Sequence, residues 1–488
     1  MKNALLINIP LTETRYPSAS LASIVPVFKK HDYNIIIKDL NLELANEFEP
    51  DMVDKVYDLC QIISNLEPNE LLLLQTWIEE KIDSLYIVPD VIAVSLLSHQ
   101  SVTFAKVFLP ILKSKFPNTT IIVGGSGVSS SLGKLTDFKT YGQYLLDNNH
   151  CTNVIFGEGE VSLDNLLQNK DYPGINKNNP VQISNLDTLD PPDYSNFDMN
   201  NYNGNILNIT GSRGCVRQCN FCDIGLTWPK FRYRSPESQV REIIEHSKKY
   251  DVTHFEFTDS LINGSVSGWI KFNELLANAK QKDPDLKDIT YAGQAICRSQ
   301  KSQPEIMYEL MHYAGVKQIS VGIESFSERI RNDMKKKFSN EAIDYHLEQC
   351  GRWSIPNIFL MIVGYPLETI EDHETNMSHL DKYKIYSDMG TIFMIRWGLT
   401  MHIYADTPLF KDANKYGIDV TKTADLEALY TWTSSLNPEL DFVERVRRRV
   451  ELYEKSNELG YSQPNSRGEL GSLLSLLETH QISKKLLT

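Results

Sequence analysis

Short apolar segments alternate with helical segments along most of this chain, and this alternation constrains the fold more than any other feature. In the first part of the chain, the apolar segments cover residues 4–9, 34–38, 91–95, 119–123 and 154–156. Helical spacing of apolar residues is found at 18–31 and 103–115, and residues 42–86 are predicted to form a helical insertion rich in Leu and Glu. Such alternation predicts a parallel sheet with helices on both faces.

The alternation returns after a stretch rich in Pro, Asp and Asn. Further strands are expected at 205–210, 253–257, 289–296, 316–323, 358–363 and 391–395. These βα units predict an α/β fold of the partial (β/α)6 TIM type, in which polar residues at the carboxyl ends of the strands are the candidates for chemistry. We therefore expect a first domain at 1–164, a linker at 165–200, a barrel at 201–405 and a helical C-terminal region at 406–488.

Composition excludes several classes of protein. The net charge of −14 argues against broad nucleic-acid binding. No apolar stretch approaches the length of a membrane span, and the first residues do not form a signal peptide, so we expect a cytoplasmic protein. One basic run, Arg445–Arg449, lies in a helical-looking segment with acidic neighbours, which favours a solvated helix face over a phosphate-binding patch.

Three cysteines form the strongest chemical signal. Cys215, Cys219 and Cys222 have CxxxCxxC spacing, which suits three irons of a 4Fe–4S cluster and leaves the fourth iron open. A zinc site usually pairs CxxC with a second CxxC or with two histidines, and no such pair lies nearby. A zinc knuckle or three unrelated buried cysteines are the alternatives.

This motif resembles that of the radical S-adenosylmethionine (SAM) enzymes, and Phe221 matches the aromatic position of the family's CxxxCxΦC form. The resemblance implies that SAM binds the open iron and that an electron from the cluster cleaves it to a 5′-deoxyadenosyl radical. The cofactor then carries the chemistry, while the protein orients it and excludes water. It also implies an electron donor such as flavodoxin or ferredoxin.

The resemblance assigns SAM contacts to strand ends of the barrel. Residues 322–325 are similar to the segment that addresses the ribose and methionine part. Residues 258–260 take the place of the segment that contacts the methionine amine, although they depart from its Gly-Gly-Glu form. The expected SAM-binding residues are Phe221, Thr258, Asp259, Ser260, Arg298, Glu324, Ser325, Ile362 and Gly364.

Simpler structural roles compete with three of these assignments. Glu324 could form an ion pair with a Lys or Arg. Asp259 could cap the helix that follows it. Arg298 could lie on the surface.

The first domain resembles the Rossmann-like cobalamin-binding domain that precedes many radical SAM enzymes. The strand ends that carry the resemblance predict cobalamin contacts at Pro10, Ser95, Gly124, Gly125, Gly127, Gly157 and Glu158. The cobalt-ligating His of the DxHxxG motif has no counterpart, since neither His31 nor His99 fits it. Cobalamin held without a His ligand and a purely structural domain are both compatible with this departure.

The resemblance therefore implies a radical SAM methyltransferase that uses cobalamin to methylate an unactivated carbon. A cobalamin-independent cyclase or rearrangement enzyme and a non-catalytic iron–sulfur protein are the alternatives. Methylthiolation of transfer RNA would call for extra cysteines in the first domain and a basic C-terminal module. We expect a small-molecule, lipid or peptide substrate, with no nucleic acid and no membrane span.

Overall fold

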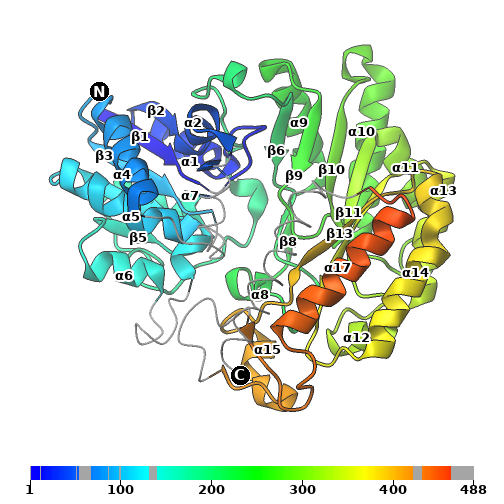
Figure 1. Cartoon of the computed structure of the whole chain (residues 1–488). Helices are drawn as coiled ribbons and strands as arrows, with labels where there is room; N and C mark the ends of the chain where they lie inside the picture. Colours follow the sequence, from blue (N-terminus) through cyan, green and yellow to red (C-terminus); the bar gives the residue numbers. More distant parts are fainter. Residues whose placement is uncertain are drawn as a thin grey trace. The chain divides into compact units, whose positions relative to one another are not determined.

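The structure is a computed structural model. It describes residues 2–10, 12–50, 52–53, 56, 68–85, 87–97, 101–130, 140–420 and 431–462. These residues divide into two compact units, with the boundary between Asn208 and Ile209 (Figure 1).

The first unit is built on a parallel sheet. Its strands are β1 (Lys2–Asn8), β2 (Tyr33–Asp39), β3 (Val91–Ser95), β4 (Thr120–Gly124) and β5 (Asn153–Ile155). They lie in the order β2-β1-β3-β4-β5, and every pair is parallel. All five residues of β3 are buried, as expected of a strand whose two faces are both covered by helices. The order reverses between β1 and β3, which is the position where ligands bind in such sheets.

Helices connect these strands. They are α1 (Ala19–Lys30), α2 (Leu40–Glu47), α4 (Pro68–Asp83), α5 (Ser101–Lys115), α6 (Tyr141–Asp147) and α7 (Gly159–Leu167), with short 3₁₀ turns at Ser126–Ser129, Leu186–Thr188 and Met199–Asn201. α4 and α5 pack together, and the side chains of Trp77, Phe104 and Phe108 join the apolar core beside β1, β3 and β4. The predicted insertion at 42–86 is helical at α2 and α4, and much of the sequence between them lies outside the described residues.

The second sheet is also parallel and follows the chain in order. Its strands are β6 (Ile206–Ile209), β9 (His254–Phe257), β10 (Thr290–Ala295), β11 (Val316–Glu324), β12 (Asn357–Val363) and β13 (Ile392–Thr400). Their order, β13-β12-β11-β10-β9-β6, is that of an open, six-stranded α/β barrel. The predicted fold class is confirmed for both sheets.

Helices and a small hairpin complete this sheet. They are β7 (Ser212–Arg213), α8 (Ile224–Thr227), β8 (Arg232–Tyr233), α9 (Pro236–Tyr250), α10 (Val266–Lys282), α11 (Glu305–Ala314), α12 (Glu328–Asp333), α13 (Asn340–Arg352), α14 (Ile370–Asp388), α15 (Pro408–Lys411) and α17 (Phe442–Glu458), with 3₁₀ turns at Pro284–Leu286 and Ala413–Tyr416. The antiparallel hairpin β7–β8 encloses the cysteine motif and was not predicted. Short strands of this kind carry no periodicity that a sequence could show.

The expectation for the basic run was wrong. Arg445, Arg448 and Arg449 are buried, and Arg447 is the exposed member of the four. α17 packs along β13 and beside α14 (Figure 1). Its three buried arginines therefore lie among the residues of the barrel unit. Buried arginines need partners, and the barrel supplies them with carbonyl groups and one carboxylate.

None of the described helices combines the length and the apolar composition that a membrane-spanning helix requires. The division into four parts remains a prediction. Of the expected helical C-terminal region, residues 421–430 and 463–488 lie outside the described residues, as does His99.

Candidate functional site

The three predicted cluster ligands lie on one loop, the cysteine loop (residues 214–223), between β7 and α8. All three cysteines are partly exposed. The Cys215 Sγ accepts a hydrogen bond from the Arg217 backbone N–H at 3.4 Å. Burial raises the pKa of Cys219, and it raises that of Cys222 to about 12. Burial therefore favours the thiol form of Cys219 and Cys222, on a loop that follows β6 and β7 along the chain.

No three His, Cys, Asp or Glu side chains in the described part of the chain are gathered around a point that could hold a metal ion. The fit to an iron–sulfur cluster thus lies in the donor set, which is three cysteines on one loop. Besides burial, Cys215 raises the pKa of Cys219, and both of these cysteines raise the pKa of Cys222. Metal binding displaces thiol protons and orders its ligands. The chain provides suitable donors, and the side chains would converge on binding.

Glu324 ends β11 in an unusual backbone conformation. Its φ of 66° is left-handed, and the β11–β12 register shifts between Gly322 and Glu324. Its partly buried carboxylate forms an ion pair with the buried Lys336, at 2.9 Å from Oε1 to Nζ. Both neighbours of Lys336 also have positive φ. Backbone strain of this kind clusters at functional sites. Here the strained residues include Glu324 and both neighbours of Lys336, and the two side chains meet at the end of β11.

The sequence analysis did not identify Lys336. Burial alone would lower the pKa of its ammonium, but the charges of Glu324 and Cys219 raise it. Those electrostatic interactions place this buried cation near the cysteine loop. The run Lys335–Lys337 was the available sequence signal, although a run of lysines usually indicates a solvated surface.

Asp259 neither caps a helix nor points to an open site. Its Oδ2 accepts a hydrogen bond from the Gly211 backbone N–H at 2.8 Å, and Ser212 is a further partner. Burial raises the pKa of Asp259 to about 7. Its carboxylate therefore secures the chain just before the cysteine loop. Next to it Thr258 is exposed, with its Oγ1 2.9 Å from that of Thr210, and Ser260 is partly exposed.

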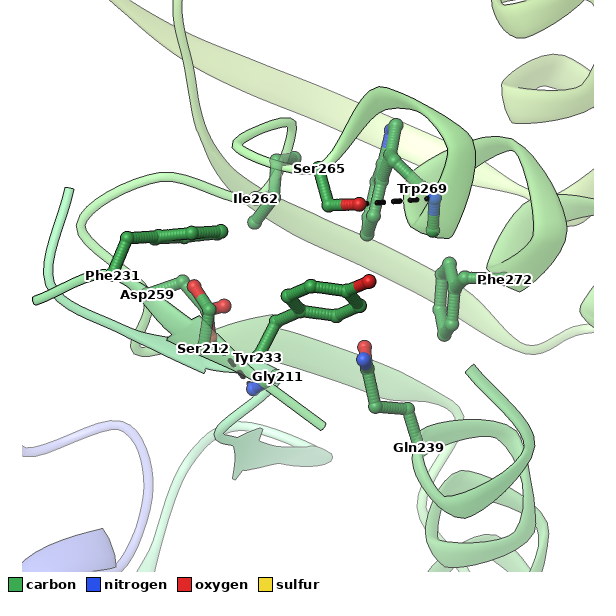
Figure 2. Close-up of a pocket in the computed structure, with 11 residues that line it drawn as sticks. Gly211, Ser212, Phe231, Tyr233, Gln239, Asp259, Ile262, Ser265, Trp269 and Phe272 are labelled. Carbon is green, nitrogen blue, oxygen red and sulfur yellow. Dashed lines mark hydrogen bonds between the residues drawn. The ribbon is translucent and has the colours of Figure 1, made fainter. Parts of the chain in front are cut away.

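A small pocket lies beside Asp259 (Figure 2). It is lined by the hairpin residues Phe231 and Tyr233 and by Trp269 and Phe272 of α10. Its volume of about 20 Å³ is enough for one water molecule but not for an organic cofactor. Figure 2 shows the Asp259 carboxylate directed at Gly211, at the side of this pocket.

Two more of the expected SAM contacts have partners within the chain. Arg298 donates to the carbonyl groups of Asn263 and Gly264 at 3.1 and 3.3 Å. Burial lowers its pKa, as does the positive charge of Arg217 on the cysteine loop. Ser325 is fully buried, and its Oγ donates to Asn376 at 3.2 Å. Arg298 therefore lies near the loop, whereas Ser325 supports the end of β11.

The end of β12 meets the C-terminal helix. Gly364 has a φ of 80°, and a Cβ there would lie 2.3 Å from Cδ of Arg445. Glycine is required because the arginine passes so close to the backbone. Ile362 and Phe221 both pack against the apolar cluster that contains Tyr365. The structure thus brings Phe221 and Ile362 to one cluster and covers Gly364 with a side chain.

In the first unit, most of the predicted cobalamin contacts share one sheet edge. The register pairs Asn8 with Ser95 and Ser95 with Gly124, so Pro10 and Gly124–Gly127 lie at the ends of the two strands on either side of β3, which ends at Ser95. A Cβ on Gly125, whose φ is 102°, would lie 2.3 Å from the Leu96 carbonyl oxygen. This glycine therefore serves the close contact between two loops of the edge.

Serine hydroxyls line the same edge. Ser95 Oγ lies 2.8 Å from Ser20 Oγ, which lies 2.9 Å from Ser18 Oγ. The hydroxyl of Ser101, at the start of α5, is buried and has no hydrogen-bond partner. Such a group calls for a water or a ligand, so the β1–β3 switch point is suited to binding a polar molecule.

The turn after β5 has a structural role in this unit. Glu158 is buried, and its Oε2 accepts a hydrogen bond from the Ile183 backbone N–H at 2.6 Å. Gly157 lies directly beside Pro180. Both residues therefore hold the segment that the sequence identified as a linker.

Residues 209–380 match the model of the Radical SAM superfamily. The match begins within β6, includes the cysteine loop and ends in α14. This part of the chain therefore matches the radical SAM family, and the resemblance predicted from the sequence is confirmed for these residues.

Curated relatives match smaller parts of the chain. A tRNA-2-methylthio-N(6)-dimethylallyladenosine synthase of Flavobacterium psychrophilum is 28% identical over 205 residues, which are 37% of this chain and 41% of that protein. An anaerobic magnesium-protoporphyrin IX monomethyl ester cyclase of Synechocystis is 23% identical over 257 residues, 48% of each chain. The chain thus spans less than half the length of these relatives.

Solved structures match the whole chain. The radical SAM methyltransferase TsrM of Kitasatospora setae, with tryptophan and a SAM analogue bound, has a TM-score of 0.66 at 13% identity and covers 99% of this chain and 100% of its own. The cobalamin-dependent radical enzyme OxsB, with aqua-cobalamin and SAM bound, has a TM-score of 0.66 at 17% identity and covers 100% of this chain and 72% of its own. At these identities the likeness establishes a shared fold: a Rossmann-like unit followed by a radical SAM barrel.

Proposed function

We propose that this chain is a cobalamin-dependent radical SAM enzyme that methylates an unactivated carbon. The main support is the cysteine loop, which carries three cysteines at the carboxyl edge of a six-stranded barrel. The ion pair of Lys336 and Glu324 lies near this loop. Cys215, Cys219 and Cys222 would ligate a 4Fe–4S cluster. When bound, the cluster supplies the electron for reductive cleavage of SAM.

The side chains around the loop have separate tasks in this proposal. Lys336 keeps a positive charge close to the ligating sulfurs, where thiolates would otherwise be costly to bury. Glu324 fixes that ammonium at 2.9 Å. Asp259 holds the chain that leads into the loop through its bond with Gly211. These residues prepare and orient the site before any substrate enters.

The first unit would hold the cobalamin. The edge at Pro10, Ser95 and Gly124–Gly127 has the fold and the polar groups that such a ligand needs. His31 is engaged by Asp164 at 2.8 Å, which supports binding without this residue as a cobalt ligand. TsrM and OxsB, which share the fold and whose structures hold bound cobalamin, support the same assignment.

A radical SAM cyclase or rearrangement enzyme without cobalamin is the second candidate. The match to the protoporphyrin ester cyclase favours it, because that relative forms a ring. The match to methylthiotransferases supports only the radical SAM part of the chain. Methylthiolation would call for a further cysteine cluster in the first domain, where the sequence has only Cys60 and Cys151. Of these, Cys151 is buried.

Anaerobic reconstitution with iron and sulfide tests the central claim. We expect about four irons per chain and 5′-deoxyadenosine when SAM and a strong reductant are added. Cys219→Ala is expected to abolish this product. The matched control is Cys151→Ala, a cysteine buried in the first unit, which should leave it unchanged. Product formation by Cys219→Ala would refute the proposal, and a cluster without any product would indicate a non-catalytic iron–sulfur protein.

A further inference from the structure

Asn220 stands in the middle of the cysteine loop, directly after Cys219, and is 3% exposed. Its Nδ2 lies 3.0 Å from the Asp333 carbonyl oxygen. The same nitrogen lies 2.7 Å from the Tyr365 hydroxyl and 3.1 Å from the Tyr416 hydroxyl. One side chain within the motif thus contacts three separate parts of the barrel unit.

The backbone of Asn220 is held as well. Its N–H donates to the Met334 carbonyl at 3.2 Å, and its carbonyl accepts from the Leu409 N–H at 2.8 Å. The Met334 contact is two residues away from Lys336. The loop is therefore fastened to the segment that carries the buried cation and to the start of α15.

The carboxylate of Asp333 sets the direction of this network. Its Oδ2 accepts from the Tyr365 hydroxyl at 2.5 Å and from the Tyr416 hydroxyl at 3.0 Å. Because both phenols donate to the carboxylate, their oxygens are left to accept from the amide of Asn220, with one of its two N–H groups shared between them. The backbone carbonyl of Asp333 also accepts from Asn220, so the Nδ2 of Asn220 must face the two phenols and this carbonyl.

This orientation leaves Asn220 Oδ1 buried with no hydrogen-bond partner. A buried acceptor without a partner is destabilising, because it has lost its hydrogen bonds to water. The amide keeps this orientation because turning it would place an oxygen against the Asp333 carbonyl. The network therefore determines how the middle of the loop is held.

We propose that Asn220 is a positioning residue that anchors the cysteine loop to the Asp333–Tyr365–Tyr416 network before any cofactor binds. The inference rests on the proposed function, since the anchored loop is the one assigned to the cluster. The side-chain and backbone contacts of Asn220 hold the middle of this loop to other segments of the barrel unit. Preorganised support of this kind raises the affinity of a site for its metal.

The test compares Asn220→Ala and Asn220→Asp with Asn273→Ala. Asn273 is a matched control: it is buried on α10, donates to the Trp269 carbonyl and accepts from the Tyr291 hydroxyl. After reconstitution, we expect Asn220→Ala to lose iron to a chelator about tenfold faster than the wild type, as the loss of one or two hydrogen bonds implies. Asn220→Asp should lose iron at least as fast as Asn220→Ala, because a carboxylate would then face the Asp333 carbonyl.

A second readout needs no cluster. In the metal-free chain, amide hydrogen exchange across residues 215–222 should be faster in Asn220→Ala than in Asn273→Ala. Equal rates of amide hydrogen exchange in the two variants, or equal rates of iron release, would contradict the proposed role of Asn220. Failure of the wild type to take up iron would count against the proposed function, while hydrogen exchange would still decide the role of Asn220.

Discussion

At the scale of single residues, partners decide what a charged side chain does. The sequence assigns Asp259 to cofactor binding, but its carboxylate accepts from Gly211 and so supports the cysteine loop instead of facing an open site. Glu324 is paired with Lys336, as one interpretation of the sequence allowed. In both cases the partner comes from a distant part of the chain.

The buried carboxyl of Asp259 makes stability depend on pH. Its pKa is about 7 in the folded chain, against about 3.9 for an unperturbed Asp. Between these values the folded chain binds a proton that the unfolded chain does not, so stability falls as the pH rises through this window. Asp259→Asn cannot ionise and should flatten this slope. Unfolding in denaturant across the window measures it, and an unchanged slope would contradict the assignment.

At the scale of elements, α17 shows how a polar helix becomes part of a core. Arg448 forms a buried ion pair with Glu368 at 3.0 Å, and Glu368 also accepts from the Gly364 N–H. Arg445 lies over the ring of Trp432, with 3.9 Å from Cζ to the ring centre. The helix is thereby joined to the end of β12, where the barrel's chemistry is expected.

Two neighbouring arginines of α17 should respond very differently to substitution. Arg448→Ala would leave Glu368 buried without its ion-pair partner, so we expect a loss of about 3–5 kcal/mol in the free energy of unfolding. Arg447 is exposed and pairs with Glu444 and Glu451 at the surface, and Arg447→Ala should cost about 1 kcal/mol or less. Denaturant titrations of both variants check this difference. Equal losses in the free energy of unfolding would show that the ion pair of Arg448 and Glu368 does not stabilise the fold.

At the scale of the whole molecule, the two proposed cofactor sites belong to two different parallel sheets. One is the β1–β3 switch point with its serines, and the other is the cysteine loop of the barrel. Their residues come from different units, which implies that the two proposed cofactors can be bound independently.

Metal analysis tests this independence. Reconstitution with iron, sulfide and hydroxocobalamin should give about four irons and about one cobalt per chain, if cobalamin binds one site of the Rossmann-like unit. Cys219→Ala should lose iron and keep cobalt. Iron without cobalt in the wild type would favour the cobalamin-independent candidate, and loss of both metals in the variant would show that the two sites depend on each other.

The sequence by itself determined the two parallel sheets and the donor set of the candidate cluster. Strand and helix periodicity and the spacing of Cys215, Cys219 and Cys222 are local properties, so they can be read along the chain. The tertiary structure alone decided that Lys336 lies beside the loop, that Asn220 anchors it and that Arg448 is buried. These roles depend on partners many residues away, such as Asp333 for Asn220 and Glu368 for Arg448, and burial and pairing at that range are properties of the folded chain.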